Sequence, residues 1–444
     1  MFHTDHRNSG TAGRPLPALL AVMALTILLS PVRLAAADLP QVLRDTLRNA
    51  PRLKEAETLV SRHRAGERAD RGGLFPLLTI EGSAGRSDGN PSPATSGREH
   101  LLRTRVQQPL YDPAGVRQWQ VKTGQRILAE EELHRTRTDL ILTTSVTWLE
   151  YLKLRTQLAR TGESIAESKR MIEMVRKRIR LGDSTRLELM DRQILLQERQ
   201  RQLATIRLRT DQLYTSLTRN AGVRYPFHSL PRIGRIPDHP PGDGGDRETG
   251  ENPLVRIARQ NVVVAGAQAE LAAAEFHPEL SLFGQHEHLR SGQQSQNRTS
   301  LGLSVTFRFD TGGSGIYRYR SQVLERRRRL FRLEREKKRA GINLAGLRSE
   351  LAMHQQKAAF RRTEVKLLLS SLESRQQVFA AGYLNTIELL RTQTKLFDAK
   401  MELTSSRFDQ VITLIRIFHA QGRLETAAAG QLYKQIFGGD LEPE

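Results

Sequence analysis

The sequence predicts a mainly α-helical protein with a small β part, built from one unit that occurs twice. The predicted unit runs helix, strand, strand, long helix and short helix. Matching residues recur about 200 residues apart, which is far longer than the repeat of a solenoid. Apolar residues follow a seven-residue spacing over long stretches, and four shorter segments alternate between apolar and polar residues. We therefore expect two copies of a domain-sized unit with internal pseudo-symmetry.

The duplication sets the expected domain boundaries. The first copy spans residues 38–222 and the second spans 251–422. A linker rich in Pro, Gly and Asp (223–250) joins them, and residues 423–444 form a tail; both are expected midway along the helical shaft. The aligned residues are Pro51 and Pro253, Ala56 and Ala258, Pro76 and Pro278, Leu78 and Leu280, Gly182 and Gly382, Glu188 and Glu388, Gln193 and Gln393, and Gly222 and Gly422.

The N-terminus is expected to be a secretory signal peptide over residues 1–37. Positive charge precedes an apolar segment at 16–30, and Ala35-Ala36-Ala37 provides a small-residue cleavage site. No later apolar stretch approaches the ~20 residues of a transmembrane helix. We therefore expect an exported protein whose mature part has no transmembrane helix.

Composition narrows the possible chemistry. The chain has 444 residues, no cysteine and a formal net charge of +21. The lack of cysteine excludes disulfides, thiolate metal sites and a thiol nucleophile. A strongly basic balance is found in proteins that bind nucleic acid or anionic surfaces, so an exported polyanion-binding protein is one alternative.

Each copy is expected to open with a helix that ends just before a proline. These helices are predicted at 39–73 and 252–276. Two strands follow in each copy, each about nine residues long, which suits a tilted strand that spans a bilayer. The predicted strands are 76–86, 101–111, 278–288 and 300–309.

The alternation predicts an apolar face toward lipid and a polar face toward a lumen. The lumen-facing residues are expected to include Arg103, Arg105 and Arg308, which favours an anionic cargo weakly. Four strands cannot close a barrel, and an open sheet edge is not stable in lipid, so several chains must pool their strands. Three chains would supply twelve, within the known range. A soluble four-stranded sheet is the alternative.

Two helical hairpins are predicted at 115–220 and 316–422. Their long arms would each reach about 100 Å. A tight turn follows each long arm, at Leu181-Gly182-Asp183-Ser184 and at Ala381-Gly382-Tyr383-Leu384. The seven-residue spacing means that the helices wind around each other. Its members are Tyr151, Leu158, Ile165, Ile172 and Ile179 in the first copy, and Leu351, Ala358, Val365, Leu372 and Phe379 in the second.

With this combination of features, the chain resembles the TolC family of outer-membrane channels, which serve type I secretion and multidrug efflux. The likeness covers nearly all of the mature chain. It depends on the repeat, on the helix-to-strand junctions GLFPLLTIEGS and EFHPELSLFGQ, and on the strand-to-helix junctions QPLYDPAG and FRFDTGGSG. The segments RLGDSTRLELMDRQ and AAGYLNTIELLRTQ, at the hairpin turns, are the most diagnostic.

The resemblance implies a homotrimer with a twelve-stranded transmembrane β-barrel continued by a twelve-helix α-barrel in the periplasm. It places the chain in the outer membrane of a Gram-negative cell. The implied partners are a periplasmic adaptor (a membrane fusion protein) and an inner-membrane ABC or proton-driven transporter. The adaptor is expected to dock on the hairpin tips, at Leu181, Gly182, Asp183, Ser184 and Thr185, and at Ala381, Gly382, Tyr383, Leu384 and Asn385.

The resemblance also implies a constriction near the tips, formed by carboxylates on the returning helices. Glu388 matches the first such position, but the second carries Arg391. Glu188 and Asp191 occupy the corresponding places in the first copy. The strongly negative, cation-collecting ring typical of the family is therefore not expected here.

We expect a passive export duct, not an enzyme, with no cofactor, no metal site and no nucleic-acid partner. The segment Asp310-Thr311-Gly312 is better explained as a strand-to-helix turn than as half of an aspartic protease. His286 and His288 lie on one strand face, but too few ligands converge there for a metal. A periplasmic coiled-coil adaptor or scaffold is a second alternative to the duct. The transported substrate stays open.

Overall fold

The computed structural model describes residues 39–87, 97–182, 184–225, 234, 236–237, 252–291, 294–308, 311–380 and 386–437. The expected signal peptide, 1–37, lies outside these residues. Apart from residue 225, these residues belong to one compact unit of residues 38–224 and 230–444. Among its described residues, no helix combines the length and the apolar character that crossing a membrane requires.

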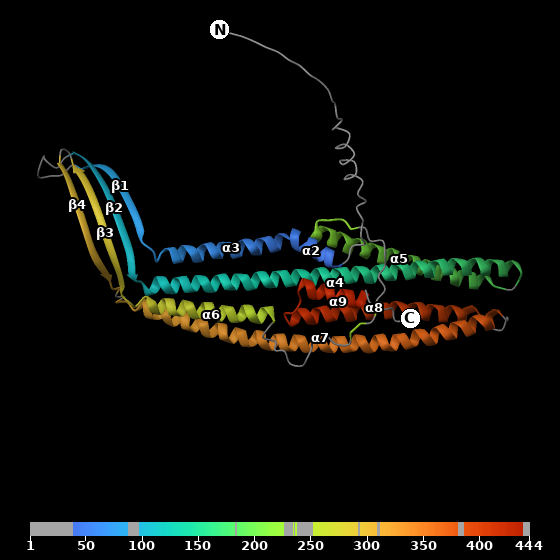
Figure 1. Cartoon of the computed structure of the whole chain (residues 1–444). Helices are drawn as coiled ribbons and strands as arrows, with labels where there is room; N and C mark the ends of the chain where they lie inside the picture. The colour runs from blue at the N-terminus through green and yellow to red at the C-terminus, as the bar shows by residue number, and fades with distance from the viewer. Residues whose placement is uncertain are drawn as a thin grey trace, which may run out of the picture. The chain divides into compact units, whose positions relative to one another are not determined.

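Each copy contains a helix, two strands, a long helix and a short helix, with the strands at one end and the far ends of α4 and α7 at the other (Figure 1). α2 comes before the first copy's α3, and α9 follows the second copy's α8. In chain order the elements are α2 (Leu39–Asn49), α3 (Pro51–Gly72), β1 (Leu77–Ser87), β2 (Gly97–Tyr111), α4 (Pro113–Arg180), α5 (Arg186–Ala221), α6 (Pro253–Ala274), β3 (Glu279–Ser291), β4 (Gln294–Thr306), α7 (Ser314–Ala380), α8 (Thr386–Ala420) and α9 (Thr426–Phe437).

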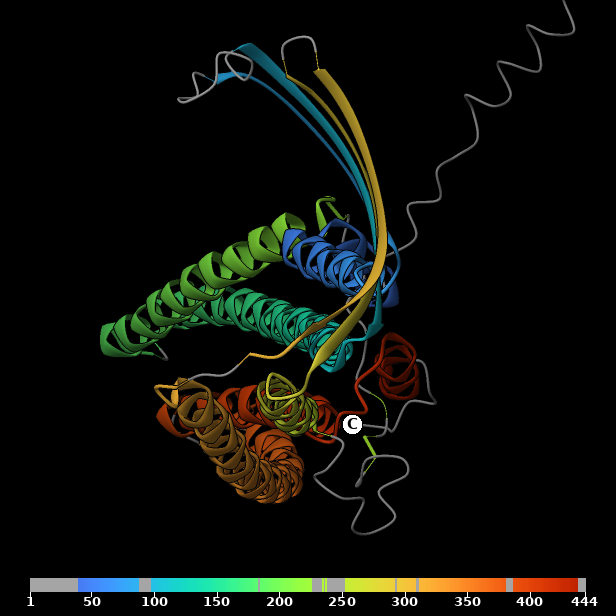
Figure 2. The ribbon, with the colours of Figure 1, turned by 90° about the vertical axis from the view of Figure 1, so that its left-hand side faces the viewer.

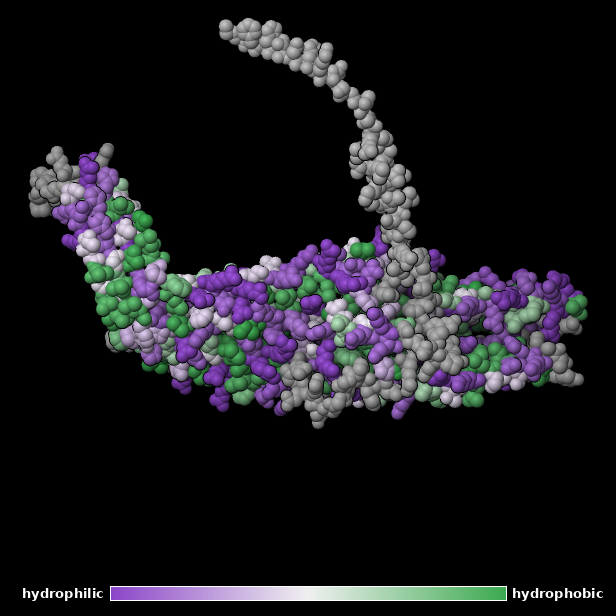
Figure 3. All heavy atoms as spheres, viewed as in Figure 1, coloured by the Kyte–Doolittle hydropathy of each residue, from purple (hydrophilic) through white to green (hydrophobic). Residues whose placement is uncertain are grey.

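The strands form one antiparallel sheet in the order β1-β2-β3-β4. Leu78 pairs with Val106, and Gly284 pairs with both Val106 and Leu301, so the alternating residues share one face as the sequence predicts. Figure 3 shows hydrophobic side chains on the part of the sheet near the helices and hydrophilic ones toward its far end. Over the described residues, β1 and β4 have no partner on their outer edges.

The strands extend further than the sequence predicts at their loop ends. β1 continues to Ser87, β2 begins at Gly97, β3 continues to Ser291, and β4 begins at Gln294. Backbone pairing continues into polar segments because the ladder needs no side-chain pattern. At its other end β4 stops at Thr306, so the predicted strand 300–309 is wrong at Phe307 and Arg308, and residue 309 lies outside the described residues.

The predicted opening helix 39–73 is in fact two helices. α2 ends at Asn49 and α3 begins at Pro51, because proline lacks an N–H and fits the first turn of a helix. The expected tail also contains a helix, α9. Leu432 and Ile436 are buried in it, so this segment packs instead of trailing away.

The long helices α4 and α7 each pair with a short returning helix, α5 and α8 respectively. α3 packs on α4, and α6 packs between α4 and α7. Each long helix thus has helical neighbours near the sheet and near the hairpin end. Figure 2, viewed from the sheet end, shows the curved sheet and the helix pairs beneath it. The core includes Trp148 on α4 and Phe408 and Leu414 on α8, all buried.

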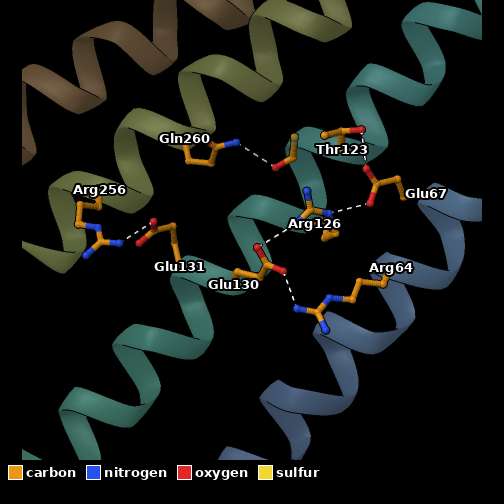
Figure 4. A network of polar contacts seen from close by, with 9 residues as sticks. Arg64, Glu67, Thr123, Arg126, Glu130, Glu131, Arg256 and Gln260 are labelled. Atoms are coloured by element: carbon orange, nitrogen blue, oxygen red, sulfur yellow. Dashed lines mark hydrogen bonds and ion pairs between the residues drawn. The ribbon is translucent and has the colours of Figure 1, made fainter. Parts of the chain in front are cut away.

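Ion pairs hold the helices together below the sheet (Figure 4). Glu130 on α4 accepts hydrogen bonds from Arg64 on α3 and from Arg126 on its own helix, at 2.8 and 2.9 Å. The hydrogen bond from Arg64 is the main cause of a lowered pKa for Glu130. On the other side of α4, Arg256 of α6 binds Glu131 at 2.7 Å. These contacts fix α3, α4 and α6 as one layer under the strands.

Candidate functional site: the hairpin tips and the polar face of the sheet

The first hairpin turn is built by a left-handed glycine and a helix cap. α4 ends at Arg180, and Gly182 has a φ of 83°, a conformation that favours glycine. Thr185 caps α5 because its hydroxyl accepts a hydrogen bond from the backbone N–H of Glu188 at 3.3 Å. Leu181, the first residue of the turn, is 76% exposed. An apolar side chain is therefore presented where the sequence expects a docking surface; Asp183 lies outside the described residues.

Glu188, predicted as a constriction residue, is engaged in the turn. The Ser184 hydroxyl donates a hydrogen bond to its carboxylate at 2.6 Å. Asp191 lies one turn further along α5 and is partly exposed. The structure therefore brings Glu188 and Ser184 together at the start of α5.

The second hairpin turn, Ala381 to Asn385, lies outside the described residues. Beyond it, the carboxylate of Glu388 on α8 accepts a hydrogen bond from Arg375 on α7 at 2.7 Å. Arg391 is exposed on α8. The negative charge of Glu388 is thus balanced within its own hairpin by Arg375, which was not among the predicted site residues.

Two buried arginines on α5 reach the second hairpin. Arg192 and Arg199 are each only 3% exposed. Arg192 donates to the Gln393 side chain of α8 at 3.1 Å, and Gln393 donates to Glu167 of α4 at 3.2 Å. Burial lowers the pKa of Arg192, while Glu188 and Glu167 act in the opposite direction. This chain of contacts joins α5, α8 and α4 close to the tips.

Arg199 makes the second connection between α5 and α8. Its guanidinium lies 3.6 Å from the ring centroid of Phe397 and 3.4 Å from the carboxylate of Asp398. It also donates to Gln202 at 3.0 Å. Burial lowers the pKa of Arg199, and Asp398 counteracts this effect. Stacking and charge together hold the two returning helices at this level.

Neither arginine was predicted as a site residue, although the repeat contains a signal for both. The residues about 200 positions later are Thr392 and Ala399, which are buried and uncharged. Two arginines seven residues apart on one helix face, matched by small residues in the other copy, mark a break in the pseudo-symmetry. Such a break indicates that one hairpin supplies a side chain to the contact that the other hairpin lacks.

The polar face of the sheet carries charges that are largely paired. Arg103 lies between Glu287 at 2.6 Å and Glu81 at 3.3 Å. Arg105 lies 5.5 Å from the ring centroid of Phe283. Arg103 and Arg105 share this face, as the sequence predicts.

Arg308, the third predicted lumen residue, lies beyond the last residue of β4. It pairs with Glu279, the first residue of β3, at 2.9 Å. The predicted arginines therefore do not form a simple positive lining, because Glu81, Glu279 and Glu287 lie beside them.

The two histidines on β3 bind polar neighbours across the sheet. His286 Nδ1 lies 2.9 Å from the Thr299 hydroxyl, and His288 Nδ1 lies 2.6 Å from Asn297 Oδ1. Over the described residues, no three side chains of the metal-binding types converge.

These features define a class of protein. The sheet has one apolar face, one charge-paired polar face and two open edges, and a shaft of paired helices continues from it. This arrangement fits a membrane channel. Residues 42–223 and 246–423 match the outer membrane efflux protein family. The chain belongs to this family.

Known proteins support the same assignment. The alkaline protease secretion protein AprF of Pseudomonas aeruginosa is 20% identical over 405 residues, covering 86% of this chain and 83% of AprF. The crystal structure of CusC has a TM-score of 0.78 at 16% identity, covering 86% of this chain and 92% of CusC. That of VceC from Vibrio cholerae has a TM-score of 0.76 at 16% identity, covering 86% and 96%.

The chain is therefore an exit duct of the outer membrane, for type I secretion or efflux, with its helices in the periplasm. The predicted fold class is confirmed. Family membership replaces the two alternatives from the sequence, a periplasmic adaptor and an exported polyanion-binding protein.

Proposed function

We propose that three copies of this chain form one continuous passive duct, in which β1 of one protomer pairs with β4 of the next. The observation that carries the proposal is the open sheet: both outer strands lack a partner over the described residues. An unpaired strand edge in lipid leaves backbone N–H and C=O groups without hydrogen bonds, at several kcal/mol each. Closure between protomers satisfies these groups.

The helices supply a second argument for assembly. α7 lies at one side of the protomer, and its exposed apolar residues continue down the shaft. At the other side, α5 has its own exposed apolar residues. Burying such side chains stabilises an interface by about 25 cal/mol per Å² of apolar surface. The residues are Phe331, Ile342, Phe360 and Leu367 on α7, and Leu187, Ile194 and Leu208 on α5.

Three is the smallest number of copies that leaves a water-filled path. Two copies would supply about eight strands, and a barrel of that size is filled by its own side chains. Three copies would supply about twelve. The charged side chains on the polar face, such as Arg103 and Glu287, favour an interior that contains water.

Light scattering on the purified, detergent-solubilised protein tests this proposal. We expect a protein mass of three copies, and voltage-independent conductance when the same preparation is inserted into planar bilayers. A monomeric mass, or three copies without conductance, would contradict the proposed duct.

We propose further that the duct works with a periplasmic adaptor and an inner-membrane transporter, which supplies the energy, and that the chain itself catalyses no reaction. The exposed Leu181 at the first hairpin turn supports a docking surface at this end. The name of AprF refers to secretion of alkaline protease, which supports a protein cargo over small molecules.

A photo-crosslinking amino acid at position 181 tests the docking surface in cells. We expect an adduct with a periplasmic adaptor and none from a matched probe at Arg68, which lies on α3 near the sheet. Equal adduct yields at both positions would refute docking at the tip.

A further inference from the structure

One segment of α7 is far more basic than its counterpart in the first copy. Residues 325–339 contain nine Arg or Lys and three Glu. The matching segment of α4, residues 125–139, contains three Arg and four Asp or Glu. The two segments occupy equivalent places in the repeat, so the helical fold does not itself require this charge. The difference therefore indicates a role that only the second copy has.

Four of these arginines form one stripe along α7, called here the arginine stripe. Its members are Arg328, Arg332, Arg335 and Arg339. The spacing i, i+4, i+7 and i+11 places them on one helix face over about 16 Å. The side chains of Arg328 and Arg335 are 71% and 68% exposed, and the other two residues are also exposed.

Few carboxylates balance the arginine stripe. Glu325 pairs with Arg328 at 2.8 Å, and Glu336 lies 3.7 Å from Arg335. Over the described residues, neither Arg332 nor Arg339 forms an ion pair. The stripe therefore keeps a net positive charge.

The stripe lies between two apolar sides of α7. Leu333 faces α6, where it packs with Val255 and Ala258. Phe331 is exposed on the side that is proposed to meet the next copy. Consecutive residues of a helix are about 100° apart, so Arg332 points between these two sides. The stripe thus lies on one flank of the helical wall, which is either its outer or its inner flank.

The surroundings of α4 show which flank is the outer one. Tyr151 faces α5 and Lys153 faces α8. Between them, Leu152 lies on one flank and is buried, whereas Glu150 lies on the other flank and is partly exposed. α2 and α9 also pack on α4, so they cover the flank of Leu152. Figure 2 shows α9 on the convex side of the curved sheet, which is the outer side.

The same geometry places the arginine stripe on the inner flank. α4 and α7 both run from the sheet toward the hairpin turns, and α6 and α8 lie between them. On α4, one step back from the residue that faces α8 leads to the outer flank. On α7 these neighbours lie on the opposite hand, so one step back, from Leu333 to Arg332, leads to the inner flank.

We propose that the arginine stripe lines the lumen and attracts acidic segments of an unfolded polypeptide cargo. This inference rests on the proposed duct and names its class of cargo. Three copies would surround one level of the lumen with the stripe, and a passage lined by one sign of charge concentrates the opposite sign. Guanidinium groups stay protonated and can donate two parallel hydrogen bonds to a carboxylate.

The length of the stripe favours a polypeptide over a small anion. Its four guanidinium groups are spread over about 16 Å, which corresponds to about five residues of an extended chain. An acidic chain can therefore contact several arginines at once and pass from one to the next. A small anion would use only one of them.

Block of the current by an acidic peptide tests the proposal. The full chain is inserted into planar bilayers, and a short poly-glutamate peptide is added. We expect the double variant Arg332→Gln/Arg339→Gln to shorten each block about fivefold or more, because two charges per copy are lost. The same variant should shift the reversal potential toward cation preference.

Arg327→Gln/Lys337→Gln is the matched control. Each of these residues lies five positions from Arg332, about 140° away around the helix. The control therefore removes two positive charges per copy at the same level, but from the other side of α7. Poly-glutamate should block it as it blocks the unchanged protein.

Further arms of the experiment separate charge, ligand and duct. Arg332→Lys/Arg339→Lys keeps the charge and should keep the block. Free glutamate at the same carboxylate concentration should block the unchanged protein no better than the glutamine double variant. Equal block of the unchanged protein and the glutamine double variant, or equal loss of block in the matched control, would overturn the proposed surface. All variants should still conduct; an unchanged protein without conductance would instead contradict the duct.

Discussion

Two buried arginines, Arg192 and Arg199, occupy positions where a coiled coil usually has apolar residues. A buried charge is costly unless it is paired or stacked. The charge of Arg199 is compensated by Asp398 and by the ring of Phe397. The charge of Arg192 is compensated by the side-chain amide of Gln393, which in turn contacts Glu167. These arginines therefore define the position of the first hairpin relative to the second. Packing of leucine side chains alone would define this position less specifically.

Replacing Arg199 by alanine tests this role. We expect Arg199→Ala to lower stability by about 1–3 kcal/mol, because it removes a buried side chain with its ring contact and its ion pair. Thermal unfolding followed by circular dichroism measures the effect. Arg201→Ala is the control: Arg201 is exposed and pairs with Glu198 of its own helix, so about 0.5 kcal/mol or less is expected. Equal shifts for both variants would contradict the account.

Charge near the tips should control ion preference. We expect Glu388→Gln to move the reversal potential toward anion preference and Arg391→Gln to move it toward cation preference, because each removes one charge per protomer. Planar bilayers under a salt gradient measure this preference. Glu57→Gln, at an exposed position on α3, should leave it unchanged. If both tip variants behave like Glu57→Gln, neither residue lines the constriction.

At the scale of elements, turns and helix contacts determine how the hairpins are arranged. Gly182 allows α4 to reverse into α5, and its φ of 83° is one that an L side chain adopts only under strain. Further from the hairpin turn, His419 of α8 contacts Asp139 of α4 at 2.7 Å, and Lys153 of α4 contacts Asp409 of α8 at 2.9 Å. The two hairpins are thus connected at several levels.

Two glycine variants should have opposite effects. Gly182→Ala should destabilise by about 1 kcal/mol, because alanine is strained in the left-handed conformation. Gly162→Ala should stabilise by about 0.5–1 kcal/mol, because Gly162 lies inside α4 and an added Cβ there meets no atom within 4 Å. Thermal midpoints by circular dichroism test the pair. A rise for both variants would refute the left-handed turn.

The α4–α8 contact should weaken in acid. Burial acts to raise the pKa of Asp139, but the hydrogen bond and charge of His419, together with Arg135 and Arg52, lower it below its ordinary value of 3.8. A carboxyl whose folded pKa is depressed stabilises the fold above its unfolded pKa and loses this contribution as pH falls through the folded value.

The variant Asp139→Asn isolates this effect. We expect the unchanged protein to lose more thermal stability than Asp139→Asn when the pH falls from about 5 to about 3. Glu55→Gln, at an exposed position on α3, should lose as much as the unchanged protein. Parallel curves for the unchanged protein and Asp139→Asn would contradict the assigned role of Asp139.

At the scale of the whole molecule, regular patterns were predictable from the sequence and local exceptions were not. Period-two alternation placed Leu78 and Leu303 on one face, because side chains in a strand must alternate. The break at Pro51 interrupted an amphipathic pattern that continued on both sides. The burial of Arg192 depends on α8, which is distant in sequence, so helix periodicity could not reveal it. Helix α9 was missed because a short apolar segment gives little periodic signal.

Crosslinking tests the central claim, closure of the sheet between protomers, most directly. The chain has no cysteine, so Ile80→Cys on β1 and Leu303→Cys on β4 introduce the only thiols. Within one protomer these strands lie about three spacings, or ~14 Å, apart, so a shorter bis-maleimide cannot join them. The account predicts covalent products of two and three copies for the paired variant, none larger, and none for either single variant. Only monomer, or a ladder that continues beyond three copies, would contradict it.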